Sequence, residues 1–485
     1  MLPDGTHCIR QRGIRYDFTL MPIYGTAADG TDKVGITDLN NGTYVLEHAS
    51  PPCSATQVAP CIPGGILPAH VVVSPNGKLF NNDYKNIQPR VGLAYRLTNN
   101  NVIRAAYGRF YDNWAAIDQT ARNIQAWPTV TYVLAQNLNP AVPSVFAENP
   151  FQGFTGPYPP PTPFNQVGWN SNPLFKNPYS DQWNFGIQHL FGSSTVMTLN
   201  YVGSHSGNTD IAIMGNSATV PGPGPITARE PYPYITPTFY DNSIGRGSYN
   251  AFQFSLNRET SHGLTYLISY TWSKAIDIGS DGWYCAEGCS IENPYDINAN
   301  KGVAGFDLTH VLTASYVYQL PFGKGNFRTG SRVVNSIIGN WQTNGILTLS
   351  SGIPYTINVC GDIANTGNGG CYERPNVVGN PNLSNPSPAL WINPAAFASP
   401  SPYTFGNMGR NVLRSDWYKD IDLSLFREFP ISESKRFEFR FDAFNATNTP
   451  TWGTPQSTLN NINFGEITGT RSTERELQLA LKFYF

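Results

Sequence analysis

The last ten residues of the chain, residues 476–485, read ELQLALKFYF. Apolar side chains occupy every second position of this stretch, at Leu477, Leu479, Leu481, Phe483 and Phe485. The positions between them hold Glu, Gln, Ala, Lys and Tyr. Successive side chains of a β-strand point to opposite faces, so the stretch predicts a strand with one apolar face and one mixed face.

The same alternation returns in ten further segments of about ten residues, the length that a tilted strand needs to cross a bilayer. In residues 264–274, for example, Leu264, Tyr266, Ile268, Tyr270 and Trp272 alternate with Thr265, Ser269, Thr271 and Ser273. The other predicted strands are 88–97, 102–111, 183–190, 195–202, 249–258, 310–320, 340–350, 419–429 and 436–445. Residues 13–20 are a candidate for a twelfth strand.

The connections between these strands alternate between short and long. Short turns are predicted at 98–101, 191–194, 259–263 and 430–435, and a longer one at 321–339 contains the helix-like sequence RVVNSIIG. The long segments carry the Pro/Gly runs PYPPPTPF and VPGPGPIT. Transmembrane barrels have short periplasmic turns and long extracellular loops. The pattern therefore predicts an all-β, antiparallel transmembrane β-barrel, although one alternating strand by itself also fits a half-buried sheet in a soluble sandwich.

Composition agrees with a β-rich, turn-rich chain. Of the 485 residues, 13% are charged and 13% aromatic, with 45 Gly and 39 Pro. The mean hydropathy of −0.29 argues against a helical membrane protein, but it does not test a barrel, whose strands are only half apolar. The net charge is −2 and the basic residues are dispersed, so no nucleic-acid partner is expected.

Six of the seven cysteines form close pairs in the long segments: Cys53 with Cys61, Cys285 with Cys289, and Cys360 with Cys371. Such pairs predict small loop disulfides, which persist in oxidising compartments. A zinc site is the alternative, although the seven histidines are scattered. The state of Cys8 is left open.

No catalytic motif is found, and neither a cofactor nor an enzymatic activity is expected. The chain has no HExxH pair, Walker loop, GxGxxG or CxxC. GSHSG at 203–207 has His205 where a nucleophile elbow needs serine, and is interpreted as a loop. DIGSDG at 277–282 and ADGTDKVG at 28–35 are interpreted as solvated turns, with incomplete calcium loops as the alternative.

Charged residues on the polar parity of the strands are interpreted as facing an enclosed lumen, where charge is tolerated. They could contact cargo or an internal plug, or pair with one another along the wall. The candidates are Arg90, Arg96, Arg104, Glu438, Arg440 and Asp442.

Several phrases together resemble the C-terminal barrel of the TonB-dependent, Oar-like outer-membrane receptors. They are NIQPRVGLAYRLTNNNVIRAAYGRFYD (86–112), SYNAFQFSLNRETSHGLTYLISYTWSKAID (248–277), FDLTHVLTASYVYQLPFGKG (306–325), NWQTNGILTLSSGIPYTI (340–357) and RFEFRFDAFNATNTPTWG (436–453). The resemblance covers residues 13–485, and it rests on the joint order of the phrases.

The resemblance implies a barrel of about 22 strands around a plug, energised by the TonB complex and transporting an unknown cargo across the outer membrane of a Gram-negative cell. It also implies that Phe485 and the alternating residues before it are the signal recognised by the barrel-assembly machinery. No signal peptide, carboxypeptidase-regulatory-like domain, plug or TonB box is found in the sequence. We therefore expect residues 1–485 to be the C-terminal part of a larger barrel, with about 11–12 of its strands. An adhesion or structural barrel without TonB coupling, and a secreted soluble β-sandwich, remain as alternatives.

Overall fold

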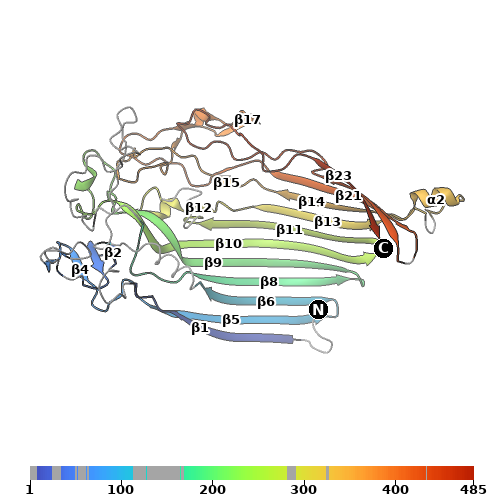
Figure 1. Cartoon of the computed structure of the whole chain (residues 1–485), viewed down its shortest axis with the longest axis horizontal. Coiled ribbons are helices and arrows are strands. Elements are labelled where there is room, and N and C mark those ends of the chain that lie inside the picture. Colours follow the sequence, from blue (N-terminus) through green and yellow to red (C-terminus); the bar gives the residue numbers. More distant parts are fainter. Residues whose placement is uncertain are drawn as a thin grey trace.

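One large antiparallel sheet dominates the computed structural model, which describes residues 8–24, 34–49, 52, 62, 65–112, 127, 164, 169–280, 291–323, 327–432 and 434–485. Twelve of its strands follow one another in chain order, each paired with the next (Figure 1). They are β1 (Cys8–Thr19), β5 (Asp83–Thr98), β6 (Asn101–Tyr111), β8 (Tyr179–Phe191), β9 (Thr195–Gly215), β10 (Thr238–Ser261), β11 (Leu264–Asp277), β13 (His310–Gln319), β14 (Trp341–Ser350), β21 (Tyr418–Pro430), β22 (Arg436–Phe444) and β23 (Glu476–Tyr484).

Smaller elements lie mostly at the end of the sheet where the long loops gather. The short strands are β2 (Gly35–Asp38), β3 (Thr43–Leu46), β4 (Val71–Val73), β7 (Trp169–Ser171), β12 (Gly302–Val303), β15 (Pro354–Tyr355), β16 (Asn376–Val377), β17 (Asn382–Ser387), β18 (Leu390–Ile392), β19 (Phe397–Ala398) and β20 (Leu413–Arg414). The helical turns are η2 (Ile226–Ala228), η3 (Ile297–Asn300) and η5 (Pro394–Ala396), and the helix α2 (Arg332–Ile338) lies at the opposite end. Within the described ranges, no helix is both long and apolar enough to cross a membrane.

All eleven predicted strands and the twelfth candidate are present, and several are longer than predicted. The β9 strand continues to Gly215 and β10 begins at Thr238, well outside the predicted limits. The prediction of a loop at 203–207 is wrong, because Gly203 pairs with Asn250 and with Trp183 inside the sheet. The alternation of apolar and polar side chains weakens at 203–207. The backbone hydrogen bonds of β9 nevertheless continue there, because β9 pairs with β8 on one side and with β10 on the other.

Neighbouring strands pair in a register that separates apolar from polar residues. Ile268 of β11 stands beside Leu256 and Ala314, whereas the next residue, Ser269, stands beside Ser255 and Thr313. Residues paired in register point to the same face of a sheet. The apolar face therefore continues from β5 to β23, through Val91, Tyr107, Phe185, Tyr201, Phe252, Trp272, Leu312, Leu347, Leu423, Phe441 and Leu479.

The sheet is open in this chain. Among the described strands, β1 pairs only with β5 and β23 only with β22, so neither end of the sheet closes on the other. An unpaired strand edge leaves backbone N–H and C=O groups without partners, which a bilayer does not tolerate.

The buried apolar cores lie among the long loops, at the end of the sheet opposite the short turns (Figure 1). One core is built on Tyr44 and Leu46 of β3, and another on Ile357, Ile392 and Phe397. The loops thus form a folded layer. We call it the loop layer, and it consists of the described residues within 20–82, 112–178, 216–237, 278–309, 351–417 and 445–475. In the part of the chain that is described, no second sheet covers the apolar face of the large sheet, where Val91, Trp272 and Leu479 are 55%, 59% and 70% exposed.

Candidate functional site

A buried polar cluster joins the loop layer to the end of the sheet. It contains Asp277 at the end of β11, Glu292, Asn300 at the end of η3, and Arg374 and Arg410 from the segment between β14 and β21. We call these five residues the loop-layer cluster. They come from three stretches of sequence, so their contacts depend on how the loops fold together.

Arg374 lies at the centre of the loop-layer cluster. Its Nη2 is 2.5 Å from Oε2 of Glu292, and its main-chain N–H donates to Oε1 of Glu292 at 2.8 Å. Its Nη1 donates to Oδ1 of Asn300 at 2.7 Å. The side chains of Arg374 and Glu292 are 6% and 4% exposed. Burial raises the pKa of Glu292, while the attraction of Arg374 opposes that rise.

Arg410 extends the network to the sheet. Its Nε donates to the carbonyl oxygen of Asn300 at 2.9 Å, and its Nη2 forms an ion pair with Asp277. Ser280 accepts a further bond from Nη1 of Arg410 at 3.2 Å. For Asp277 the expectation of a solvated turn is wrong, because Asp277 ends β11 and is paired with Arg410. Residues 281–282 of that stretch, and 28–33 of the stretch at 28–35, lie outside the described residues.

Glu373 lies beside this cluster with one carboxylate oxygen unsatisfied. Its Oε1 accepts the main-chain N–H of Ala364 at 2.9 Å, but its Oε2 has no hydrogen-bond partner, and the residue is 1% exposed. Burial, more than the nearby charges of Asp362 and Glu292, raises the pKa of Glu373 to about 7.

Glu373 predicts a pH dependence of the loop layer. The folded state keeps the Glu373 proton to a higher pH than the unfolded chain, so the free energy of unfolding falls as pH rises from the ordinary glutamate pKa to about 7. We expect Glu373→Gln to remove this fall and to make the loop layer more resistant to protease at about pH 8 than the parent, with little difference at about pH 5. An unchanged protease resistance of the variant at the higher pH would contradict this assignment.

A hollow of about 440 Å³ lies where the polar face of the sheet meets the loop-layer cluster. Its lining includes hydroxyl and charged groups: Ser204, Ser206, Arg246, Tyr249, Asp277 and Ser280. A small ligand in this hollow would find both hydrogen-bond donors and acceptors. Within the described residues, no group of three or more His, Cys, Asp or Glu side chains is placed to hold a metal ion.

The six charges predicted to face a lumen all lie on the polar parity of their strands. Arg90 and Arg96 share a face with Arg104, whose register partner on β5 is Ala94. On β22, Arg440 and Asp442 form an ion pair of 2.7 Å. Glu438 lies 3.7 Å from Lys482 of β23. Seven strands lie between β6 and β22 in the sheet. The arginines of β5 and β6 are therefore not neighbours of the charged residues of β22 in the sheet.

The terminal residues predicted as an assembly signal lie on the apolar face of β23. Leu477, Leu479 and Leu481 pair with Ala443, Phe441 and Phe439 of β22. Phe483 packs against Phe437, with ring centroids 4.8 Å apart. Phe485 follows the last strand residue and is 91% exposed.

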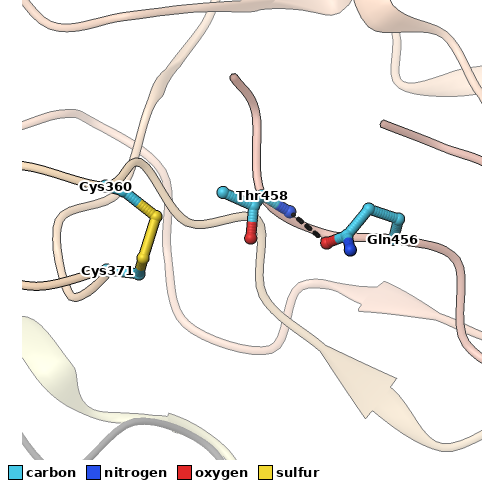
Figure 2. Close-up of a disulfide and its surroundings, with 4 residues drawn as sticks. All are labelled: Cys360, Cys371, Gln456 and Thr458. Atoms are coloured by element: carbon cyan, nitrogen blue, oxygen red, sulfur yellow. Dashed lines mark hydrogen bonds between the residues drawn. A yellow bond between two sulfur atoms is a disulfide. The ribbon is translucent and has the colours of Figure 1, made fainter. Parts of the chain in front are cut away.

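One predicted disulfide lies within the described residues. Cys360 and Cys371 are joined in the loop layer, next to a turn in which the Thr458 N–H donates to Oε1 of Gln456 (Figure 2). Cys53, Cys61, Cys285 and Cys289 lie outside the described residues. Cys8 is a free, exposed thiol at the start of β1.

Sequence reasoning missed the loop-layer cluster. Its arginines and acids are separated by up to 133 residues, and no spacing rule links them.

The long antiparallel strands, the two chemically distinct faces and the folded loops at one end are together the features of an outer-membrane barrel wall. A family model agrees: the chain belongs to the outer membrane beta barrel domain family, whose model matches residues 11–478. The protein is therefore located in the outer membrane, and the soluble sandwich is excluded. No curated protein sequence matches the chain.

Similar solved structures are outer-membrane transporters and receptors. The outer membrane transporter YddB from Escherichia coli has 12% identity and a TM-score of 0.43, with 84% of this chain and 41% of that one covered. The pyoverdine outer membrane receptor FpvA from Pseudomonas aeruginosa has 12% identity and a TM-score of 0.40, covering 84% and 37%. The FrpB iron transporter from Neisseria meningitidis has 9% identity and a TM-score of 0.38, covering 84% and 40%. The chain thus spans 37–41% of the length of these proteins.

Proposed function

We propose that residues 1–485 are the C-terminal part of the barrel of a TonB-dependent transport receptor. The observation that carries the proposal is a polar, charged sheet face that leads directly to a folded loop layer. A passive structural wall needs no such layer, whereas a receptor uses extracellular loops on a rigid scaffold to capture its ligand. The joint order of the sequence phrases described above supports the same family.

In this proposal the short turns lie in the periplasm and the loop layer lies outside the cell. A ligand held by the loops would enter the lumen past the hollow beside Asp277 and Arg246. Polar side chains such as Asn200, Gln253 and Thr271 then line the path. Glu438, Arg440 and Asp442 are paired along the wall. The charges that would contact cargo or a plug supplied by another part of the protein are Arg90, Arg96 and Arg104. No residue of the chain performs chemistry on the cargo.

TonB coupling is testable by direct binding. The full-length protein in lipid nanodiscs is expected to bind the purified periplasmic domain of TonB from the same organism, with saturation at micromolar concentrations. A control lacking the region that precedes this chain is expected not to bind. Absence of binding by the full-length protein, when an established receptor of that organism binds, would favour the adhesion or structural barrel instead.

The end of β23 is proposed to be recognised by the barrel-assembly machinery. Phe485→Ser removes an aromatic group that is 91% exposed and follows the last paired residue, with the loss of one ring contact, to Phe483 at 5.9 Å between centroids. We therefore expect several-fold less assembled protein in the outer membrane, measured as the heat-modifiable form on a gel. Tyr484→Ser, on the polar parity, is the control; it removes a hydroxyl bond to Glu438 and a ring contact with Arg436, and it is still expected to change assembly less. Equal effects of the two substitutions would argue against recognition of the apolar parity.

A further inference from the structure

The turn between β13 and β14 carries the helix α2, which extends past the ends of the strands (Figure 1). The base of this turn is closed: Leu320 N–H donates to the carbonyl of Trp341 at 2.8 Å. Gly323 has a φ of +76°, and a Cβ there would lie 2.7 Å from the Cα of Gly339. Gly323 before α2 and Gly339 after it thus lie close together, which a side chain at Gly323 would prevent.

Three hydrogen bonds from two side chains place the C-terminal end of α2 on the apolar side of the sheet. Trp341 and Arg427 are register partners on the apolar parity of β14 and β21. The indole N–H of Trp341 donates to the carbonyl of Ile337 at 3.0 Å. The guanidinium of Arg427 donates to the same carbonyl at 2.6 Å and also to the carbonyl of Ser336. These bonds satisfy carbonyl groups that the end of a helix leaves free.

Arg427 is a charge on the apolar face, and its surroundings cover it. It is 7% exposed, with the Phe429 ring 4.4 Å and the Trp341 ring 5.7 Å from its guanidinium carbon. The α2 end, Trp341 and Phe429 thus enclose the cation against the wall. Nη1 and Nη2 of this guanidinium are bonded to carbonyl groups of α2, whereas Nε is buried without a hydrogen-bond partner. Enclosure by aromatic rings and carbonyl groups makes the cation compatible with a neighbouring lipid phase.

The turn exposes an apolar surface next to this contact. Val333 and Ile337 lie one helical turn apart and are 69% and 62% exposed. Val334, Phe322 and Phe327 extend the surface, with exposures of 40%, 43% and 57%. We call these five residues the turn patch. Arg328 and Arg332 are exposed beside it, so the turn has both apolar and basic groups.

We propose that the turn patch is an interfacial membrane anchor that inserts into the periplasmic leaflet of the outer membrane. Lipid is the favoured partner of the turn patch, because α2 is hydrogen-bonded to Trp341 and Arg427, which lie on the lipid-facing side of the sheet. An apolar helix face with basic residues beside it is suited to the boundary between headgroups and acyl chains, where arginine meets phosphate. The anchor would hold the β13–β14 hairpin at one depth in the bilayer.

Site-directed spin labelling of the full-length protein tests this proposal, in vesicles of phosphatidylethanolamine and phosphatidylglycerol. In a Cys8→Ser background, single cysteines replace Ile337 on the turn patch, Ser336 on the polar side of α2, or Asn99 in the β5–β6 turn. The collision rates of each label with oxygen, which concentrates in lipid, and with a water-soluble nickel chelate are compared. Gel heat-modifiability verifies that each variant is folded.

The ratio of oxygen to nickel collisions is expected to be several-fold higher at position 337 than at positions 336 and 99. Equal access of the nickel chelate to positions 337 and 99 would place the turn patch in water and overturn the proposal. Exclusion of both reagents from position 337 would also overturn it, because it would show a protein surface covering the patch. Neither result depends on TonB coupling, so the proposed transport function is tested separately.

Discussion

Replacing Ile268 by arginine is expected to remove most of the folded, membrane-inserted protein. Ile268 is the fifth residue of β11. In a strand tilted as in barrels, this position lies about 12 Å in depth from the turn. The hydrocarbon band around a barrel is about 25 Å thick, so Ile268 lies near its midplane. Its register partners Leu256 and Ala314 offer no counter-charge. Arginine at this depth on a lipid-facing wall costs about 2–4 kcal/mol of folding free energy. Urea unfolding in vesicles, followed by heat-modifiable migration, measures the loss.

The neighbouring substitution Ser269→Arg is the matched control. Ser269 belongs to the same strand but lies on the polar face beside Ser255 and Thr313. If that face borders an aqueous lumen, the longer side chain finds water there, and the expected cost is below about 1 kcal/mol. A larger loss from Ser269→Arg than from Ile268→Arg would show that the two faces of the sheet have been assigned the wrong way round.

Replacing Arg374 by methionine is expected to open the loop layer while leaving the barrel wall folded. The substitution keeps most of the side-chain volume but leaves the Glu292 carboxylate buried without its cation. Removing one partner of a buried ion pair costs about 3–5 kcal/mol. Because every Arg374 contact lies in the loop layer, hydrogen exchange and external protease should detect the change at 291–300 and 351–417. The strands of the wall should keep their protection.

The double variant Glu292→Gln with Arg374→Met separates the ion pair from simple packing. Removing both charges should restore much of the stability, since no unpaired charge remains buried. The single Arg374→Met variant should also be less damaging at low pH, because Glu292 can then bind a proton and become neutral. If the double variant is as unstable as the single one at every pH, the contribution of Arg374 is packing and hydrogen bonding rather than charge.

The strands could be predicted because the period of side-chain alternation is a local property. Ile268 and Ser269 are distinguished by sequence parity alone, and their partners in β10 follow from the short turn that joins β10 to β11. The partners in β13 do not, because a long loop joins β11 to β13. The limits of β9 and β10 were predicted less well. Their outer parts, including Gly203 and Thr238, lack the alternation that contact with lipid imposes, and they are strands because of pairing with each other.

The sequence by itself determined an antiparallel sheet with one apolar and one polar face, its turn pattern, and the family phrases, since each depends on residues that are close along the chain. Only the tertiary structure showed that Glu292 meets Arg374 and that Arg427 bonds to α2. These contacts join residues 82 and 90 positions apart. Such pairs are decided by how loops and turns pack in space, and the energy that selects them comes from burial and charge pairing that no local pattern records.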